Sequence, residues 1–200
     1  MSIPVGRIEQ EMSYTYEDWL NFDDGVHAEI IDGQIVMMAP PSQRHEEIQV
    51  ELTRQFANFL LGKPCKVFGS RFGVKLKLSR TKHTVVQPDI MVVCNRSKLT
   101  GQICDGAPDL VIEILSPSNI RHDTFVKFNL YLQAGVKEYW IVYPDEDAVM
   151  VYTLNGTKYE STAYDYPNYV TIPVGILPGL EIDLNLVFEQ ESAEPTGETP

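Results

Sequence analysis

A mixed α/β fold, in which helices flank a central β-sheet, is predicted by the order of apolar patterns along this 200-residue chain. Apolar residues recur at helical spacing in two segments, near 43–61 and 123–133. Short apolar runs typical of strands lie between and after these segments. This order favours one mixed sheet with helices on both of its faces.

The first elements of the chain are a short helix and a β-hairpin. The helix, over 16–22, follows Thr15 as a capping residue and has acidic residues in its first turn. The run HAEIIDGQIVMM then alternates around Asp32 and Gly33. An Asp-Gly pair between two strand-like runs is a strong hairpin signal, so two antiparallel strands are expected here.

A long helix is predicted over 43–61, with Ser42 as its N-cap. Gly62 and Pro64 end it. Its apolar residues share one face and are Ile48, Leu52, Phe56, Phe59 and Leu60.

Strand-like runs make up most of the remaining chain. They are CKVFGS, FGVKLKL, VVQPDIMVV, DLVIEIL, EYWIVYP, AVMVYTL and KYEST. A second helix starts at Asn119 or Asp123 and reaches about Gln133, where Gly135 ends it. The last run, VTIPVGILPGLEIDL, is interrupted by proline and glycine, which predicts a place at a sheet edge.

Length and composition predict one intracellular domain over 1–188, followed by an acidic, disordered tail over 189–200. No stretch approaches the roughly 20 apolar residues that span a bilayer. The N-terminus lacks a signal-peptide pattern, so a cytoplasmic location is expected. Cys65, Cys94 and Cys104 show no CxxC spacing and are predicted to be free thiols.

The net charge of −12 argues against non-specific binding to nucleic acid, which relies on Lys and Arg beside phosphates. A nuclease is compatible with this charge, because the carboxylates of a metal site add to the negative count. DNA binding would then need a local basic patch, a dimer or a partner protein.

Two acidic residues interrupt apolar strand-like runs, and they are the main candidates for a site. Asp89 lies in VVQPDIMVV and Glu113 lies in DLVIEIL. An isolated carboxylate in a strand covered on both faces costs several kcal/mol or more, unless it is paired, protonated or bound to a metal. The alternatives for each acid are a salt bridge to Lys or Arg and a place at a frayed strand end.

Carboxylates of this kind suit a hard divalent cation. Mg²⁺ prefers oxygen ligands and keeps several waters, so one or two carboxylates and a substrate phosphate complete its coordination. Asp109 is not the partner of Glu113, because four residues of strand separate them by about 13 Å. Asp89, on a different strand, can lie opposite Glu113 and is the better partner.

Several segments, taken in their serial order, resemble one known family. These are HAEIIDGQIVMMAPPSQRHEEI, VVQPDIMVV, PDLVIEILSPS, KFNLYLQAGVKEYWIVYP and ILPGLEIDL. They are similar to the Uma family of restriction endonucleases, within the PD-(D/E)XK nuclease superfamily, from about Tyr16 to Phe188. The resemblance implies a restriction-endonuclease-like core with a metal site on its central strands.

The resemblance also assigns residues. Asp89, after Pro88, matches the first acid of the superfamily and Glu113 the second, which implies that both hold the metal. The superfamily's lysine is expected two residues later, where this chain has Leu115. Lys127, in KFNLYLQAGV, matches a lysine moved to the following helix, and its alternative is an ordinary surface lysine.

Four auxiliary residues follow. Glu29 matches an acid on the first hairpin, and His45 and Glu46 match the start of the long helix. Gln87 shares a strand face with Asp89 by the period of two and is expected to line the site. The alternatives are solvated or hairpin acids for Glu29 and Glu46, and a polar helix-start residue for His45. His27, His83 and His122 lack ligand spacing and are predicted to be structural or surface residues.

The leading hypothesis is an Mg²⁺-dependent endonuclease, with Mn²⁺ as a substitute, acting on DNA as a homodimer. Asp89 and Glu113 would bind the metal, and Lys127 would position the attacking water. The principal alternative is an inactive nuclease-fold module that binds nucleic acid or a protein, favoured by Leu115 and the acidic charge. A hydrolase of another phosphate ester is a third possibility.

Overall fold

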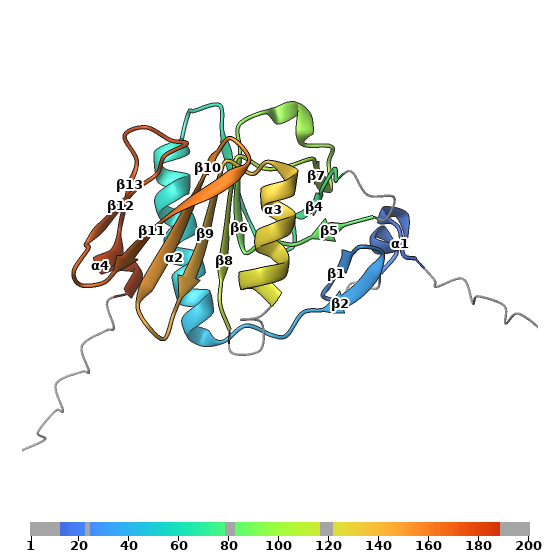
Figure 1. The fold of residues 1–200 in the computed structure, drawn as a ribbon, viewed down its shortest axis with the longest axis horizontal. Helices are drawn as coiled ribbons and strands as arrows, with labels where there is room; N and C mark the ends of the chain where they lie inside the picture. Colours follow the sequence, from blue (N-terminus) through green and yellow to red (C-terminus); the bar gives the residue numbers. More distant parts are fainter. Residues whose placement is uncertain (1–12, 23–24, 79–82, 117–121, 189–200) are drawn as a thin grey trace, which may run out of the picture.

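The computed structural model of the chain describes residues 13–22, 25–78, 83–116 and 122–188. A six-stranded sheet forms its centre, with helices on both faces (Figure 1). In spatial order its strands are β11 (Lys158–Asp165), β10 (Ala148–Asn155), β9 (Glu138–Tyr143), β8 (Leu110–Ile114), β6 (Ile90–Val93) and β3 (Lys66–Gly69). β8 and β9 run parallel and the other neighbours antiparallel, which confirms the predicted mixed α/β fold.

A second, five-stranded sheet lies beside the first, and the sequence did not predict it as a separate unit. In spatial order its strands are β2 (Gln34–Met37), β1 (Ala28–Ile31), β5 (Val85–Val86), β4 (Gly73–Lys75) and β7 (Ile103–Asp105). β4 and β7 are parallel and the other pairs antiparallel.

The two long helical segments cover opposite faces of the central sheet. Figure 1 shows α3 (Phe128–Ala134) in front of the sheet and α2 (Gln43–Leu60) behind it. The helical elements are α1 (Tyr16–Leu20), α2 (Gln43–Leu60), the 3₁₀ turn η1 (Arg96–Lys98), the π-helix η2 (His122–Lys127), α3 (Phe128–Ala134) and α4 (Leu184–Phe188).

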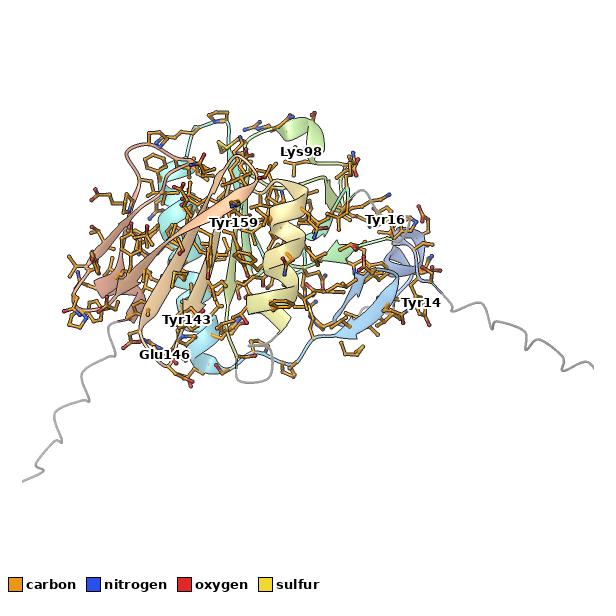
Figure 2. All side chains as sticks on the ribbon, viewed as in Figure 1. Tyr14, Tyr16, Lys98, Tyr143, Glu146 and Tyr159 are labelled. Atoms are coloured by element: carbon orange, nitrogen blue, oxygen red, sulfur yellow. A yellow bond between two sulfur atoms is a disulfide. The ribbon has the colours of Figure 1, made fainter. Side chains whose placement is uncertain are left out.

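Alternation along β6 and β8 divides the core into two clusters. Ile90 and Ile112 pack with the apolar stripe of α2, whose buried members are Ile48, Leu52, Phe56 and Leu60. Met91 and Val111 point to the other face and pack with Leu130 and Tyr131 of α3. Ring contacts among Phe128, Tyr139, Tyr152 and Tyr159 extend this second cluster. Figure 2 shows Tyr159 beside α3.

Local signals predicted the first elements correctly. Thr15 caps α1 with a reciprocal hydrogen-bond pair to Asp18. The hairpin of β1 and β2 turns at Asp32 and Gly33, both with positive φ. Ser42 caps α2 by accepting a hydrogen bond from the His45 N–H at 3.2 Å.

The run VVQPDIMVV, predicted as one strand, is two strands in different sheets. β5 ends at Val86 and β6 begins at Ile90. Pro88 lies between them, and its ring nitrogen cannot donate to a sheet ladder. Asp89 therefore lies at the entrance of β6, and its predicted place inside a strand is wrong.

The C-terminal run forms its own hairpin of β12 (Thr171–Pro173) and β13 (Glu181–Asp183), which packs on the α2 side. Glu138 connects this hairpin segment to the central sheet, since its carboxylate accepts hydrogen bonds from Trp140 Nε1 at 2.7 Å and the Ile176 N–H at 2.8 Å. Burial raises the pKa of Glu138, although these hydrogen bonds oppose the shift.

The prediction of three free thiols is wrong for two of them. Cys65 and Cys94 form a disulfide, and only Cys104 is a free, buried thiol. The ladder of β3 and β6 explains the pairing, because the register of Lys66 opposite Val93 places Cys65 opposite Cys94 one step further. Pairing across two strands leaves no short sequence motif.

Two further expectations concern the whole chain. None of the helices in the described ranges is long and apolar enough to cross a membrane. The predicted tail over 189–200 lies outside the described residues. The single domain over 1–188 and the cytoplasmic location stay predictions.

Candidate active site

A cavity of about 560 Å³ opens where the ends of β6 and β8 meet the start of α2 and the end of η2. The turn after β3 and the segment after β2 complete its wall. Every residue assigned to the site from the sequence, except Glu29, lines this cavity. They are His45, Glu46, Gln87, Asp89, Glu113 and Lys127.

Asp89 and Glu113 lie opposite each other on two neighbouring strands. β6 and β8 pair with Ile90 opposite Ile112, so the same register, continued by one residue, places Asp89 opposite Glu113. Directly opposed residues in an antiparallel pair have their Cβ atoms about 4.5–5.5 Å apart on one face. Both side chains therefore reach the same cavity.

The Asp89 carboxylate is fixed through one of its oxygens. Oδ2 accepts a hydrogen bond from the Ile114 N–H at 2.7 Å and lies 3.3 Å from His45 Nε2. Gln49 of α2 donates to the Asp89 main-chain carbonyl at 2.7 Å. Among the described residues none donates a hydrogen bond to Oδ1, which leaves this oxygen available to a ligand in the cavity.

Glu113 forms a compact polar cluster beneath the cavity with residues from three other elements. Its Oε1 accepts a hydrogen bond from the Tyr131 hydroxyl at 2.6 Å and lies 3.1 Å from Lys127 Nζ. The same ammonium lies 3.0 Å from Glu29 Oε1. Glu29, Glu113 and Lys127 are each at most 2% exposed, so Lys127 is not a surface lysine.

Lys127 reaches Glu113 from the helix and not from the strand. It is the last residue of the π-helix η2, directly before α3. Leu115, at the usual lysine position, is buried in the core cluster under α3. A lysine at position 115 would place its side chain among apolar residues. Lys127 instead brings its ammonium to Glu113 from the end of η2.

Glu29 and Gln87 form a hydrogen bond with each other, and Glu29 also contacts Lys127. The Gln87 N–H donates to Glu29 Oε1 at 2.8 Å, and this carboxylate also holds Lys127. Glu29 is therefore a buried ion-pair residue and not a solvated hairpin acid. Gln87 lines the cavity as expected, although its segment is not a strand.

His45 and Glu46, at the start of α2, differ in their environment. The His45 side chain is buried and lies beside Asp89, while the Glu46 side chain is half exposed at the cavity rim. Glu46 Oε1 is 3.9 Å from His45 Nδ1. His27 also lines the cavity, which differs from its expected surface or structural role.

Three residues of the site were missed by the sequence analysis. Tyr131 and Gln49 lie on helices whose sequence does not distinguish them from ordinary helical residues, and Arg71 lies in a turn between two strands. Burial raises the pKa of the Tyr131 hydroxyl well above its ordinary value, and the charges of Glu113 and Glu29 add to this shift.

Tyr131→Phe is expected to lower divalent-metal affinity or metal-dependent activity by about 10- to 100-fold, because an outer partner that orients a ligand is lost. Isothermal titration calorimetry with Mn²⁺ measures the affinity. Tyr143→Phe is the matched control, since Tyr143 does not line the cavity. Equal Mn²⁺ affinities of the two variants would show that the Tyr131 hydroxyl does not contribute to metal binding.

The donor set fits a divalent cation that takes much of its coordination from water. Within the described ranges there is no group of three or more His, Cys, Asp or Glu residues arranged to hold a metal ion. Mg²⁺ does not need one, because it is held by one or two carboxylates and substrate phosphates. The site brings together three carboxyl groups, of Glu29, Asp89 and Glu113, and one lysine amine, of Lys127, and this excess of acidic groups suits a cation.

The other buried acids of the sheet have structural partners away from the cavity. Asp109 accepts hydrogen bonds from Lys137 Nζ at 2.7 Å and the Cys94 N–H at 2.8 Å. Burial opposes its ionisation, yet these hydrogen bonds prevail and the pKa of Asp109 is lowered. Asp109 does not line the cavity that Asp89 and Glu113 share.

Comparisons with known proteins agree with this architecture. The Uma2 family, described as "Putative restriction endonuclease", matches residues 14–185. The curated "Uncharacterized protein slr1290" of Synechocystis sp. is 36% identical over 104 residues, which are 52% of this chain and 53% of that protein. The chain thus matches about half the length of this curated relative.

A solved structure is also similar. The crystal structure of a protein from Anabaena variabilis, titled a putative nuclease belonging to DUF820, superposes with a TM-score of 0.72 and 24% identity. The match covers 88% of this chain and 97% of that one. At this level of identity, the likeness shows a shared fold.

Proposed function

We propose that this chain, which belongs to the Uma2 family of restriction endonucleases, hydrolyses DNA phosphodiester bonds with a divalent metal held by Asp89 and Glu113. One observation carries the proposal. The two carboxylates oppose each other across β6 and β8 in one cavity, and the Lys127 ammonium lies 3.1 Å from Glu113.

Mg²⁺ is the proposed ion, and Mn²⁺ is expected to replace it because both suit carboxylate and water ligands. When bound, the ion would lower the pKa of a water and stabilise negative charge on the reacting phosphate. Asp89 and Glu113 would hold it, with Glu46 as an additional contact at the rim.

The chain's own residues would orient the reacting groups. Lys127 is proposed to hydrogen-bond the attacking water through Nζ and to balance the charge of the phosphate. Glu29, whose Oε1 lies 3.0 Å from this ammonium, would help to keep it in place. Tyr131 and the Ile114 N–H fix the rotamers of Glu113 and Asp89, so that neither carboxylate must reorganise when the ion binds.

A homodimer is part of the proposal, because two active sites are the simplest means of cutting both strands of a duplex. Tyr139 and Trp140 of β9 are fully buried, so they would not contribute to a contact between two copies. Tyr164 and Tyr169, whose rings meet edge to face at 5.3 Å, are more accessible, and Tyr169 is 48% exposed.

The test is cleavage of supercoiled plasmid DNA by the purified chain. We expect nicked and linear products with Mg²⁺ or Mn²⁺ and none with EDTA. If DNA binds but stays intact with both ions, the chain is the inactive nuclease-fold module that Leu115 suggests. Hydrolysis of a simple phosphate ester without cleavage of DNA would instead indicate a different substrate.

A further inference from the structure

Arg71 adopts a backbone conformation that its residue type rarely takes. Its φ is +77°, in the turn between β3 and β4 where the chain passes from one sheet to the other. Two other non-glycine residues of the described chain have positive φ, and both are aspartates, Asp32 and Asp147. Aspartate tolerates the left-handed region through local hydrogen bonds, but arginine has no such compensation. A strained residue beside a cavity points to a role for its side chain.

In the part of the chain that the structure describes, the Arg71 guanidinium contacts an imidazole and not a carboxylate. Its Nη2 lies within hydrogen-bond distance of His27 Nε2, so the imidazole accepts from it. No carboxylate of the described residues forms an ion pair with Arg71, whereas Arg44, Arg54 and Lys127 all contact acids. Arg71 is exposed to solvent, and none of the acids in the described ranges neutralises its positive charge.

Hydrogen bonds of Gln87 connect the main chain of Arg71 to Glu29, which contacts Lys127. Gln87 Nε2 approaches the Arg71 carbonyl at 3.5 Å, and the Gln87 N–H donates to Glu29. Arg71 lines the same cavity as Asp89 and Glu113. Apart from the buried Lys127, it is the one Lys or Arg among the lining residues that the structure describes.

We propose that Arg71 binds a phosphate of the DNA backbone next to the scissile phosphate, and that His27 positions its guanidinium. This inference rests on the proposed nuclease function and adds the residue that holds the substrate strand. In a chain with a net charge of −12, an exposed arginine that lines the cavity and pairs with no acid of the described segments supplies the local attraction that a polyanion needs. A guanidinium also binds phosphate through two parallel hydrogen bonds.

The experiment compares cleavage kinetics of Arg71→Gln with wild type on one synthetic duplex at several salt concentrations. We expect KM to rise about 10- to 100-fold, as for a lost hydrogen bond to a charged group, with kcat within a few-fold of wild type. The slope of log KM against log salt should fall by about 0.9, the value for one phosphate contact on duplex DNA.

Arg96→Gln is the matched control. Arg96 is exposed, donates to a main-chain carbonyl and does not line the cavity, so its loss should leave KM and the salt slope near wild type. If the wild-type chain cleaves DNA and Arg71→Gln has an unchanged KM, the proposed phosphate contact is wrong but the proposed nuclease function is not. Absence of cleavage by the wild-type chain overturns the proposed function itself.

The Arg71→Gly variant distinguishes the loss of the side chain from an effect on folding stability. Glycine adopts positive φ without strain, so the thermal midpoint should equal or exceed that of wild type while KM rises as in Arg71→Gln. A KM rise confined to the glutamine variant contradicts the proposal.

The positioning role of His27 is tested with two variants, His27→Gln and His27→Leu. Glutamine retains a hydrogen-bond acceptor, so His27→Gln should keep KM closer to wild type than His27→Leu does. Equal KM values in these two variants contradict the positioning role.

Discussion

Asp89→Asn and Glu113→Gln are each expected to lower Mg²⁺-dependent DNA cleavage by at least about 100-fold, beyond the loss typical of an outer-shell change. Each substitution replaces a charged ligand by a neutral amide of nearly the same shape. The asparagine oxygen can still accept the Ile114 N–H, and the glutamine oxygen can still accept from Tyr131. The fold should therefore survive while the charge that attracts the cation is reduced.

The loss is measured as the initial rate of plasmid nicking at saturating Mg²⁺. Asp105→Asn is the control, because Asp105 pairs with Lys77 at 2.7 Å outside the cavity and its substitution should leave the rate unchanged. Circular dichroism establishes that each variant is folded. Wild-type rates in a folded Asp89 or Glu113 variant would show that these carboxylates do not bind a catalytic metal.

Lys127→Met is expected to destabilise the protein by about 3–5 kcal/mol, because two almost fully buried carboxylates lose the cation that lies 3.0 and 3.1 Å from them. Methionine fills the volume of the lysine stem, so packing changes little. For a chain of this size, each kcal/mol lowers the midpoint by about 2–4 °C, which predicts a fall of roughly 6–20 °C.

Thermal unfolding without divalent metal measures this effect, and Lys137→Met is its control. Lys137 also pairs with a buried acid, Asp109, but its side chain is 65% exposed. Its loss should cost about 1 kcal/mol or less. If both variants unfold at the wild-type temperature, the Lys127 cluster does not stabilise the fold, and its role must be sought in catalysis alone.

Patterns carried by single segments were predictable from the sequence. The helical stripe of α2, the hairpin at Asp32 and Gly33, and the caps Thr15 and Ser42 depend on residues close together in the chain. Asp89 and Glu113 were found because a carboxylate in an apolar run is energetically unusual. That signal also applies to the buried acid Glu138, which the sequence analysis overlooked and which has a structural role.

Features that depend on tertiary register were not predictable in the same way. The break at Pro88 places β5 and β6 in different sheets, and only the assembled structure shows which sheet each joins. The disulfide of Cys65 and Cys94 follows from the pairing of β3 with β6. Lys127 was found through family resemblance, since nothing in its local sequence predicts burial between two acids.

The direct test of the shared metal site is calorimetric titration of Mn²⁺ into the wild-type chain and into Asp89→Asn, Glu113→Gln and Asp105→Asn. We predict one binding event per chain in the wild type and in Asp105→Asn, weakened at least about 10-fold in each of the other two variants. Equal Mn²⁺ affinity in all four proteins would contradict the claim that the opposed carboxylates of β6 and β8 hold a single cation.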